Sequence, residues 1–149
     1  MLIIDLSSFF ERDLNKLKEE VSLYRDEGKL WLTPPGISNC TGNLCLHLVG
    51  NLNHFIGATL GQTGYVRHRD DEFALKNIPR QDILTNLDNT ILVVRETLSK
   101  MTDEDLQKEY PLEKHDQRVS TGHMLVHLVW HLGYHLGQIN YHRRLLDKD

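Results

Sequence analysis

The sequence has very little cysteine. Cys40 and Cys45 are the only two among 149 residues, and they form neither a CxxC motif nor a larger framework. A disulfide scaffold needs several paired cysteines, so this class of small protein is excluded. Cys45 falls at the start of an expected helix, where the helix N-terminus lowers the pKa of a thiol and creates a candidate reactive group. The alternative, which we favour, is a small residue buried in the core.

Long apolar runs and an excess of basic charge are also missing. Each apolar stretch is broken by His, Asn or Gly far short of the roughly 20 residues that cross a bilayer, so we expect no membrane span. The net charge is −4, with acidic and basic residues interspersed, and we therefore expect no nucleic-acid partner. The opening residues MLIID lack the basic and apolar regions of a secretory signal, which predicts a cytoplasmic protein.

The chain does contain enough apolar residues for one core. Its length of 149 residues and its hydrophobic content of 40 % predict a single domain over residues 1–149. Apolar residues recur at intervals of three and four over four segments, which is the pattern of amphipathic helices. The predicted helices cover about 5–26, about 41–60 after a cap within 39–41, about 80–101, and 121–146 after a cap at Ser120 or Thr121.

Glycine and proline separate these helices. Gly28 predicts a stop after the first helix, and the two prolines within 31–36 predict a loop. Residues 61–79 are polar and predict a long ordered loop, whereas residues 102–120 predict a crossover with one short helical turn. The fold class is therefore all-α, and its two long connections permit an order other than up-down-up-down.

Histidine is unusually abundant towards the end of the chain. Five of the nine histidines lie in the last quarter: His123, His127, His131, His135 and His142. Residues i and i+4 of a helix stack one turn apart, so His131 and His135 can direct both imidazoles at one metal ion. The pairs 123/127 and 127/131 have the same spacing and remain alternatives.

A third nitrogen can come from the second helix. His47, Asn51 and His54 form one polar strip there, and only one of the two histidines is needed. Three neutral imidazoles with a fourth position open is the arrangement of catalytic rather than structural zinc. The alternative for each histidine is a hydrogen-bonded core or boundary group. By default we place four further histidines at the surface: His68, His115, His123 and His142.

Three segments resemble a known superfamily. The string HLGYHLGQ at residues 131–138 resembles the H-x-x-x-H-x-G-Q motif near the end of DinB-like (YfiT-like) proteins. The string NLCLHLVGNL at residues 43–52 resembles the first ligand segment of that superfamily. It resembles most the branch in which H-x-x-G-N is followed by a charged R-x-R-D-x-E-F loop, here RHRDDEF at residues 67–73.

The resemblance implies a ligand set and a fold. It makes His47, His131 and His135 the metal ligands, leaves His54 out, and makes Gln138 a candidate partner of a ligand. It implies a four-helix bundle of DinB/YfiT-like type with an uncommon helix order, a homodimer, and a bound divalent cation, zinc or nickel. Gly133 and Gly137 leave one side of the last helix bare, which permits the close approach of another helix or chain.

The resemblance also suggests a reaction. Some DinB-like proteins are similar to thiol S-transferases, in which the metal presents a low-molecular-weight thiol to a small electrophile. A metal-dependent hydrolase and a non-catalytic, metal-binding stress-response bundle are the alternatives. Tyr134 stands where the superfamily often has a second histidine, and it can donate a hydroxyl or simply pack. Arg67 or Arg69 can bind a substrate carboxylate, or the loop can be held by its own ion pairs.

Overall fold

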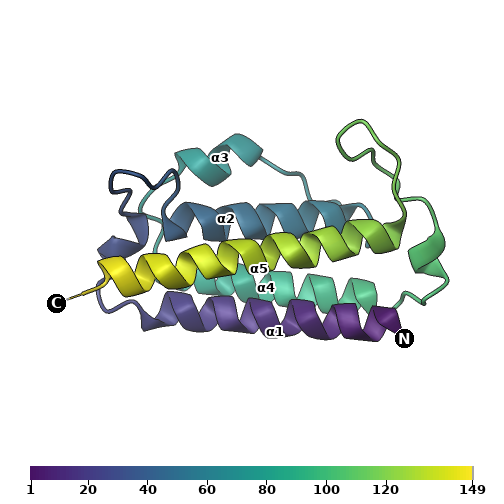
Figure 1. The fold of residues 1–149 in the computed structure, drawn as a ribbon, viewed down its shortest axis with the longest axis horizontal. Helices are drawn as coiled ribbons and strands as arrows, with labels where there is room; N and C mark the ends of the chain where they lie inside the picture. The colour runs from purple at the N-terminus through teal and green to yellow at the C-terminus, as the bar shows by residue number, and fades with distance from the viewer. Residues whose placement is uncertain (149) are drawn as a thin grey trace.

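The computed structural model describes residues 1–148, and four main helices carry most of that range (Figure 1). They are α1 (Leu2–Leu23), α2 (Thr41–Leu52), α4 (Arg80–Leu98) and α5 (Thr121–Leu146). Shorter elements are η1 (Glu27–Trp31), the π-helical η2 (Asn53–Ala58), α3 (Arg69–Ala74) and η3 (Asp105–Gln107). Over residues 1–148 there are two isolated β-bridges and no β-strand, which confirms the all-α prediction.

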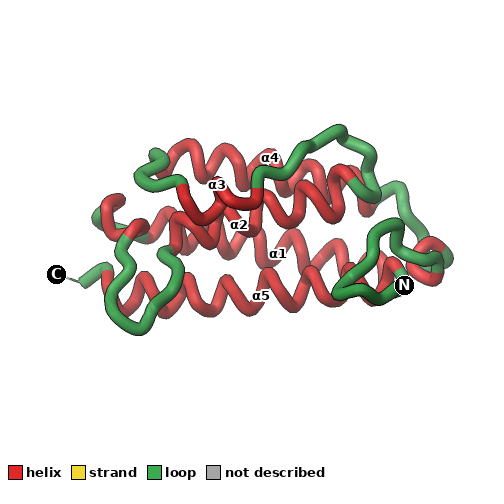
Figure 2. Tube along the Cα trace, turned by 90° about the horizontal axis from the view of Figure 1, so that it is seen from above, coloured by secondary structure: helices red, strands yellow, loops and turns green. Residues whose placement is uncertain are grey.

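The four main helices lie side by side with their axes nearly aligned (Figure 1). α1 packs against α4 and α5, and α2 packs against the same two helices. α1 and α5 run in one direction, whereas α2 and α4 run in the other (Figure 1). The order is therefore not up-down-up-down, as the two long connections allow. The connection between α2 and α4 returns along the outside of α2 and carries α3 (Figures 1 and 2).

The core lies between the apolar stripes of these helices. α1 contributes Phe10, Leu14 and Leu17, which are at most 1 % exposed. The other three main helices contribute further fully buried side chains to the same core: Leu48, Leu52, Leu87, Leu125, Leu128 and Leu132. Burial of each such side chain contributes about 1.5–3 kcal/mol, so the packing of these stripes, rather than helix propensity, holds the helices together.

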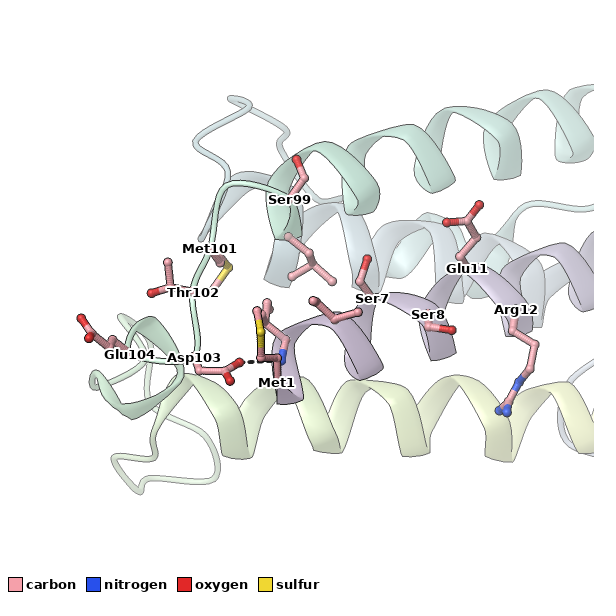
Figure 3. Close-up of a pocket in the computed structure, with 13 residues that line it drawn as sticks. Met1, Ser7, Ser8, Glu11, Arg12, Ser99, Met101, Thr102, Asp103 and Glu104 are labelled. Carbon is pink, nitrogen blue, oxygen red and sulfur yellow. Dashed lines mark hydrogen bonds between the residues drawn. The ribbon is translucent and has the colours of Figure 1, made fainter.

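The first helix is shifted from its predicted position. α1 starts at Leu2 because the Asp103 carboxylate accepts a hydrogen bond from the backbone N–H of Ile3 at 2.9 Å, which satisfies a free donor of the first turn (Figure 3). It ends at Leu23, before Gly28, because Tyr24 takes an extended conformation. Asp26 then accepts from the N–H of Gly28 at 2.8 Å and begins η1, so the predicted loop starts with a short helix.

Two other predictions need correction. The polar segment 61–79 is not loop throughout, since residues Arg69–Ala74 form α3. The second helix keeps its α-helical pattern only to Leu52 and continues as a π-helix. The last helix starts and ends as predicted, and the Ser120 side chain accepts from the N–H of His123 at 3.1 Å. Over residues 1–148, every helix is too short or too polar for a bilayer span.

Candidate metal centre

Three histidines from two helices meet at one point. His47 lies on α2, and His131 and His135 lie one turn apart on the adjacent α5. Nε2 of His131 lies 3.1 Å from Nε2 of His47 and 3.1 Å from Nε2 of His135. One ring nitrogen from each of the three histidines lies within 4.8 Å of the other two. This is the set that the family resemblance implied.

Side chains hydrogen-bonded to Nδ1 orient two of the rings, one from a buried carboxylate and one from an exposed amide. Nδ1 of His47 lies 3.0 Å from Oε1 of Glu72, which is itself only 6 % exposed. Nε and Nη2 of Arg67 donate to the two oxygens of Glu72, each at 2.8 Å. On α5, Nδ1 of His135 lies 2.6 Å from Oε1 of Gln138. A carboxylate and an amide oxygen only accept, so Nδ1 of both histidines carries the proton.

With the proton on Nδ1 of both rings, too few protons remain for the three Nε2 atoms to hydrogen-bond one another. Nε2 of His47 and Nε2 of His135 are bare lone pairs, and both point at Nε2 of His131. A neutral His131 has one proton, so Nε2 can satisfy only one of the two; if the proton is instead on Nδ1, that buried atom has no partner in residues 1–148. A cation at the centre accepts the lone pairs of all three Nε2 atoms, with the proton of His131 then on Nδ1. Two ligands of tetrahedral zinc lie roughly 3.3 Å apart, close to the observed 3.1 Å separations. The residues present therefore fit a divalent metal ion.

The imidazoles are in the form that binds metal. Burial, followed by the charges of His135 and His47, lowers the pKa of His131 to about 3. Burial also lowers the pKa of His47, although Glu72 opposes this, and it lowers the pKa of His135. All three rings are therefore neutral at pH 7, and no proton has to be displaced before a cation binds.

The other histidines have different surroundings. His54 is absent from the cluster and packs against the ring of Phe55. His68, His115 and His123 are exposed, as predicted.

The surface placement of His142 was wrong. This side chain is 4 % exposed, with Nδ1 2.6 Å from the Tyr24 hydroxyl and Nε2 2.9 Å from the carbonyl oxygen of Leu32. The end of α5 packs against η1, which is why a histidine near a helix terminus becomes buried.

Cys45 and Tyr134, which we considered as reactive groups, are both packed against other side chains. Cys45 is fully buried in the core, and burial raises the pKa of its thiol, so the reactive alternative is wrong. Tyr134 is 54 % exposed. The centroid of its ring lies 5.5 Å from the ring centroid of Trp130 and 5.4 Å from that of His135. Tyr134 therefore packs beside the cluster, and its hydroxyl forms no hydrogen bond within residues 1–148.

Sequence reasoning missed the role of Glu72. Its carboxylate lies directly over Gly50, where an added Cβ would come within 1.9 Å of Oε2. A glycine in a helix costs about 1 kcal/mol relative to alanine. Gly50 comes one turn after His47, so an otherwise unfavourable glycine beside a candidate ligand was the available signal. The same contacts show that Arg67 forms an ion pair within its own loop.

A cavity of about 270 Å³ opens beside the cluster. His47, Asn51 and His127 contribute to one wall, and Arg69 and Lys114 contribute to another. A larger groove of about 1020 Å³ lies between the start of α1 and the end of α4, but its lining contains neither histidine nor cysteine (Figure 3). The smaller cavity is therefore the one that adjoins metal-binding chemistry.

Comparison with models of protein families identifies the family of the chain. A family model described as "Protein of unknown function (DUF1572)" matches residues 10–149. This range includes all three histidines of the cluster and Glu72. No curated protein matches the chain.

Proposed function

The chain belongs to the family described as Protein of unknown function (DUF1572), and we propose that it is a DinB/YfiT-like, metal-dependent thiol S-transferase that acts on small electrophiles. The observation that carries the proposal is the convergence of Nε2 of His47, His131 and His135 at one point. Nε2 of His47 and Nε2 of His135 both lack a proton, so the three atoms cannot all be satisfied by hydrogen bonds to one another. In this proposal the fold is a four-helix bundle with two long crossovers, forming one domain over residues 1–149 of a cytoplasmic protein.

The ligand set supports an open site. Three protein nitrogens leave a fourth position for a small ligand, as in catalytic zinc sites, and imidazole suits zinc and nickel equally. The chemistry that such a cation supplies is a lowered pKa for a coordinated thiol, which puts a low-molecular-weight thiol in its thiolate form. In such a transfer the thiol sulfur would bond to the electrophilic carbon, the leaving group would depart with the bonding electrons, and the thiol proton would go to solvent.

The residues around the cluster have distinct tasks in this proposal. Glu72 and Gln138 hold the rings of His47 and His135 with Nε2 facing inward. Arg67 keeps Glu72 in place through two hydrogen bonds. Because both oxygens of Glu72 are engaged, this carboxylate is not free to deprotonate a water molecule, which favours thiol transfer over hydrolysis.

We further propose that the protein is a homodimer that pairs through α5. Three aromatic side chains of this helix are more than half exposed: Trp130, Tyr134 and Tyr141. Gly137 has no atom within 4 Å of an added Cβ, so a second helix can approach its backbone closely. An exposed aromatic stripe with a glycine gap is typical of a surface that a partner covers.

Metal analysis and conjugation assays test the proposed function together. The purified protein should contain one divalent ion per chain, and His47→Ala and His135→Ala should lose it, whereas His54→Ala, a matched control on the same polar strip, should retain it. Full metal content in His47→Ala would contradict the ligand assignment. Loaded protein should conjugate at least one cellular thiol to a reactive electrophile. Bound metal without turnover for any thiol would instead support the non-catalytic, metal-binding bundle.

A further inference from the structure

The cavity beside His47 has an unbalanced charge. Three basic side chains line it, Arg67, Arg69 and Lys114, together with one acid, Glu113. Arg67 is neutralised by its two hydrogen bonds to Glu72. Neither Arg69 nor Lys114 forms an ion pair within residues 1–148, although Arg69 lies over the ring of Phe73. Counting these two cations against Glu113 leaves one positive charge facing the cavity.

Lys114 is held where a ligand can reach it. Its backbone forms a two-way pairing with Gln117, with the two N–H···O contacts at 2.8 and 2.9 Å. This turn brings a residue of the crossover between α4 and α5 over the cavity. The side chain is partly buried, and burial lowers the pKa of its ammonium group. A partly buried cation without a counter-ion gains more from an anionic ligand than a fully hydrated lysine does.

Asn51 provides a second, independent observation. It follows His47 by one helical turn, is 7 % exposed and lines the same cavity. Its Oδ1 is buried and has no hydrogen-bond partner within residues 1–148. A buried amide oxygen without a donor costs about 1–3 kcal/mol, so this oxygen does not hold the amide in its present orientation. A flip of the Asn51 side-chain amide exchanges the oxygen and the NH₂ group, so that the NH₂ group is presented as a donor instead.

We propose that this cavity binds the carboxylate of a small ligand through Arg69, Lys114 and Asn51. The lining side chains carry one net positive charge and a divalent ion at the adjoining cluster would add to it, so the cavity favours an anion. The guanidinium and ammonium groups are donors that match the two acceptor oxygens of a carboxylate. The volume of about 270 Å³ is below that of the pockets that take drug-sized molecules, so the ligand is small. The inference rests on the proposed function in that the ligand is a substrate of the adjoining cluster. The carboxylate belongs either to the thiol or to the electrophile.

The binding test uses butyrate and its uncharged amide, butyramide, titrated into metal-loaded protein and followed by NMR. Butyrate should bind and butyramide should not. Lys114→Gln should raise the Kd for butyrate about tenfold, the effect of losing one charge-assisted hydrogen bond. Lys100→Gln, which removes an exposed lysine outside this cavity, should leave the Kd unchanged and serves as the matched control.

Three outcomes of this titration would overturn the proposal. The first is equal binding of butyrate and butyramide, and the second is an unchanged Kd in Lys114→Gln, which would place butyrate elsewhere, including on the metal. The third is tighter binding of inorganic phosphate than of butyrate at the same cavity.

A kinetic test distinguishes the two sources of the carboxylate. Cysteine and cysteamine differ only by a carboxylate on the thiol, and iodoacetate and iodoacetamide differ by one on the electrophile. Lys114→Gln should raise KM for the carboxylate-bearing partner and leave KM for its uncharged counterpart unchanged. If the protein conjugates none of these pairs but still binds butyrate through Lys114, the proposed transferase activity is contradicted and the carboxylate site is supported. Conjugation with an unaltered butyrate Kd in the variant contradicts the site alone.

Discussion

Glu72 accepts a hydrogen bond from Nδ1 of His47 at 3.0 Å, across twenty-five residues of sequence. The contact sets the tautomer of His47, directs its Nε2 at the other two histidines, and is itself held by Arg67. A loop that looks only charged in the sequence therefore serves as the support of the candidate metal centre.

Removal of Glu72 should weaken metal binding. We expect Glu72→Ala to lower the affinity for zinc by about 10–100-fold, the usual effect of losing the partner of a ligating histidine. Glu72→Gln keeps an oxygen that accepts from Nδ1 and should lose less. Competition with a chromophoric chelator measures both affinities, and wild-type affinity in Glu72→Ala would show that Glu72 does not orient His47.

An added methyl group at Gly50 should act through the same carboxylate. The new Cβ would lie 1.9 Å from Oε2 of Glu72, which cannot move without leaving Arg67 and His47. We expect Gly50→Ala to cost about 1–3 kcal/mol in the free energy of unfolding and to lower zinc affinity.

Gly42→Ala is the matched control for this prediction. It overpacks the same helix against the ring of Trp31, 2.5 Å from the new Cβ and away from the cluster. Denaturant unfolding should show a loss of stability in both variants. Chelator competition should show a loss of zinc affinity in Gly50→Ala alone. Equal zinc affinities in the two variants would contradict the proposal that Gly50→Ala acts on the metal centre through Glu72.

Glu20 should make stability depend on pH in the acid range. This α1 side chain is 1 % exposed and accepts from Nε of Arg143 at 2.6 Å and from Nδ2 of Asn140 at 2.8 Å, both on α5. Burial alone would raise its pKa, but these two hydrogen bonds outweigh burial and hold the pKa below the ordinary 4.5. A lowered folded-state pKa stabilises the fold above pH 4.5, and this stabilisation is lost as the pH falls through the folded value.

Glu20→Gln tests this dependence. At pH 7 we expect it to cost about 2 kcal/mol in the free energy of unfolding, because it removes a charge-assisted hydrogen bond. The difference from the wild type should shrink as the pH falls below 4.5, where Glu20 is protonated as well. Urea unfolding at a series of pH values measures it, and a difference that stays constant down to pH 3 would argue against the role of this carboxylate.

His142 should matter for folding and not for metal. Its ring joins the Tyr24 hydroxyl to the carbonyl oxygen of Leu32, and His142→Ala leaves that oxygen without this partner and opens a cavity. We expect a loss of about 2–4 kcal/mol in the free energy of unfolding. Metal content measured on the folded variant should stay at the wild-type level, and a loss of metal would show that His142 supports the cluster.

The helices and one half of the candidate site could be predicted from the sequence. Apolar periodicity located the four main helices, and α5 has the predicted limits because Ser120 is a local cap. The start of α1 and the helix α3 could not be predicted in this way. The first depends on Asp103, a distant residue that accepts from the N–H of Ile3, and the second is a six-residue helix with too few residues for a periodic pattern.

The sequence by itself determined that His131 and His135 share a face, because the i to i+4 spacing is a local property of any helix. Residue spacing left open whether His47 or His54 joins them, because the two lie about two helical turns apart on one strip, and only the family resemblance favoured His47. The tertiary structure supplies the physical reason, since the way α2 packs on α5 sets which level of one helix meets His131. The burial of His142 and the contact of Glu72 with His47 were decided in the same way, by residues brought together from distant parts of the chain.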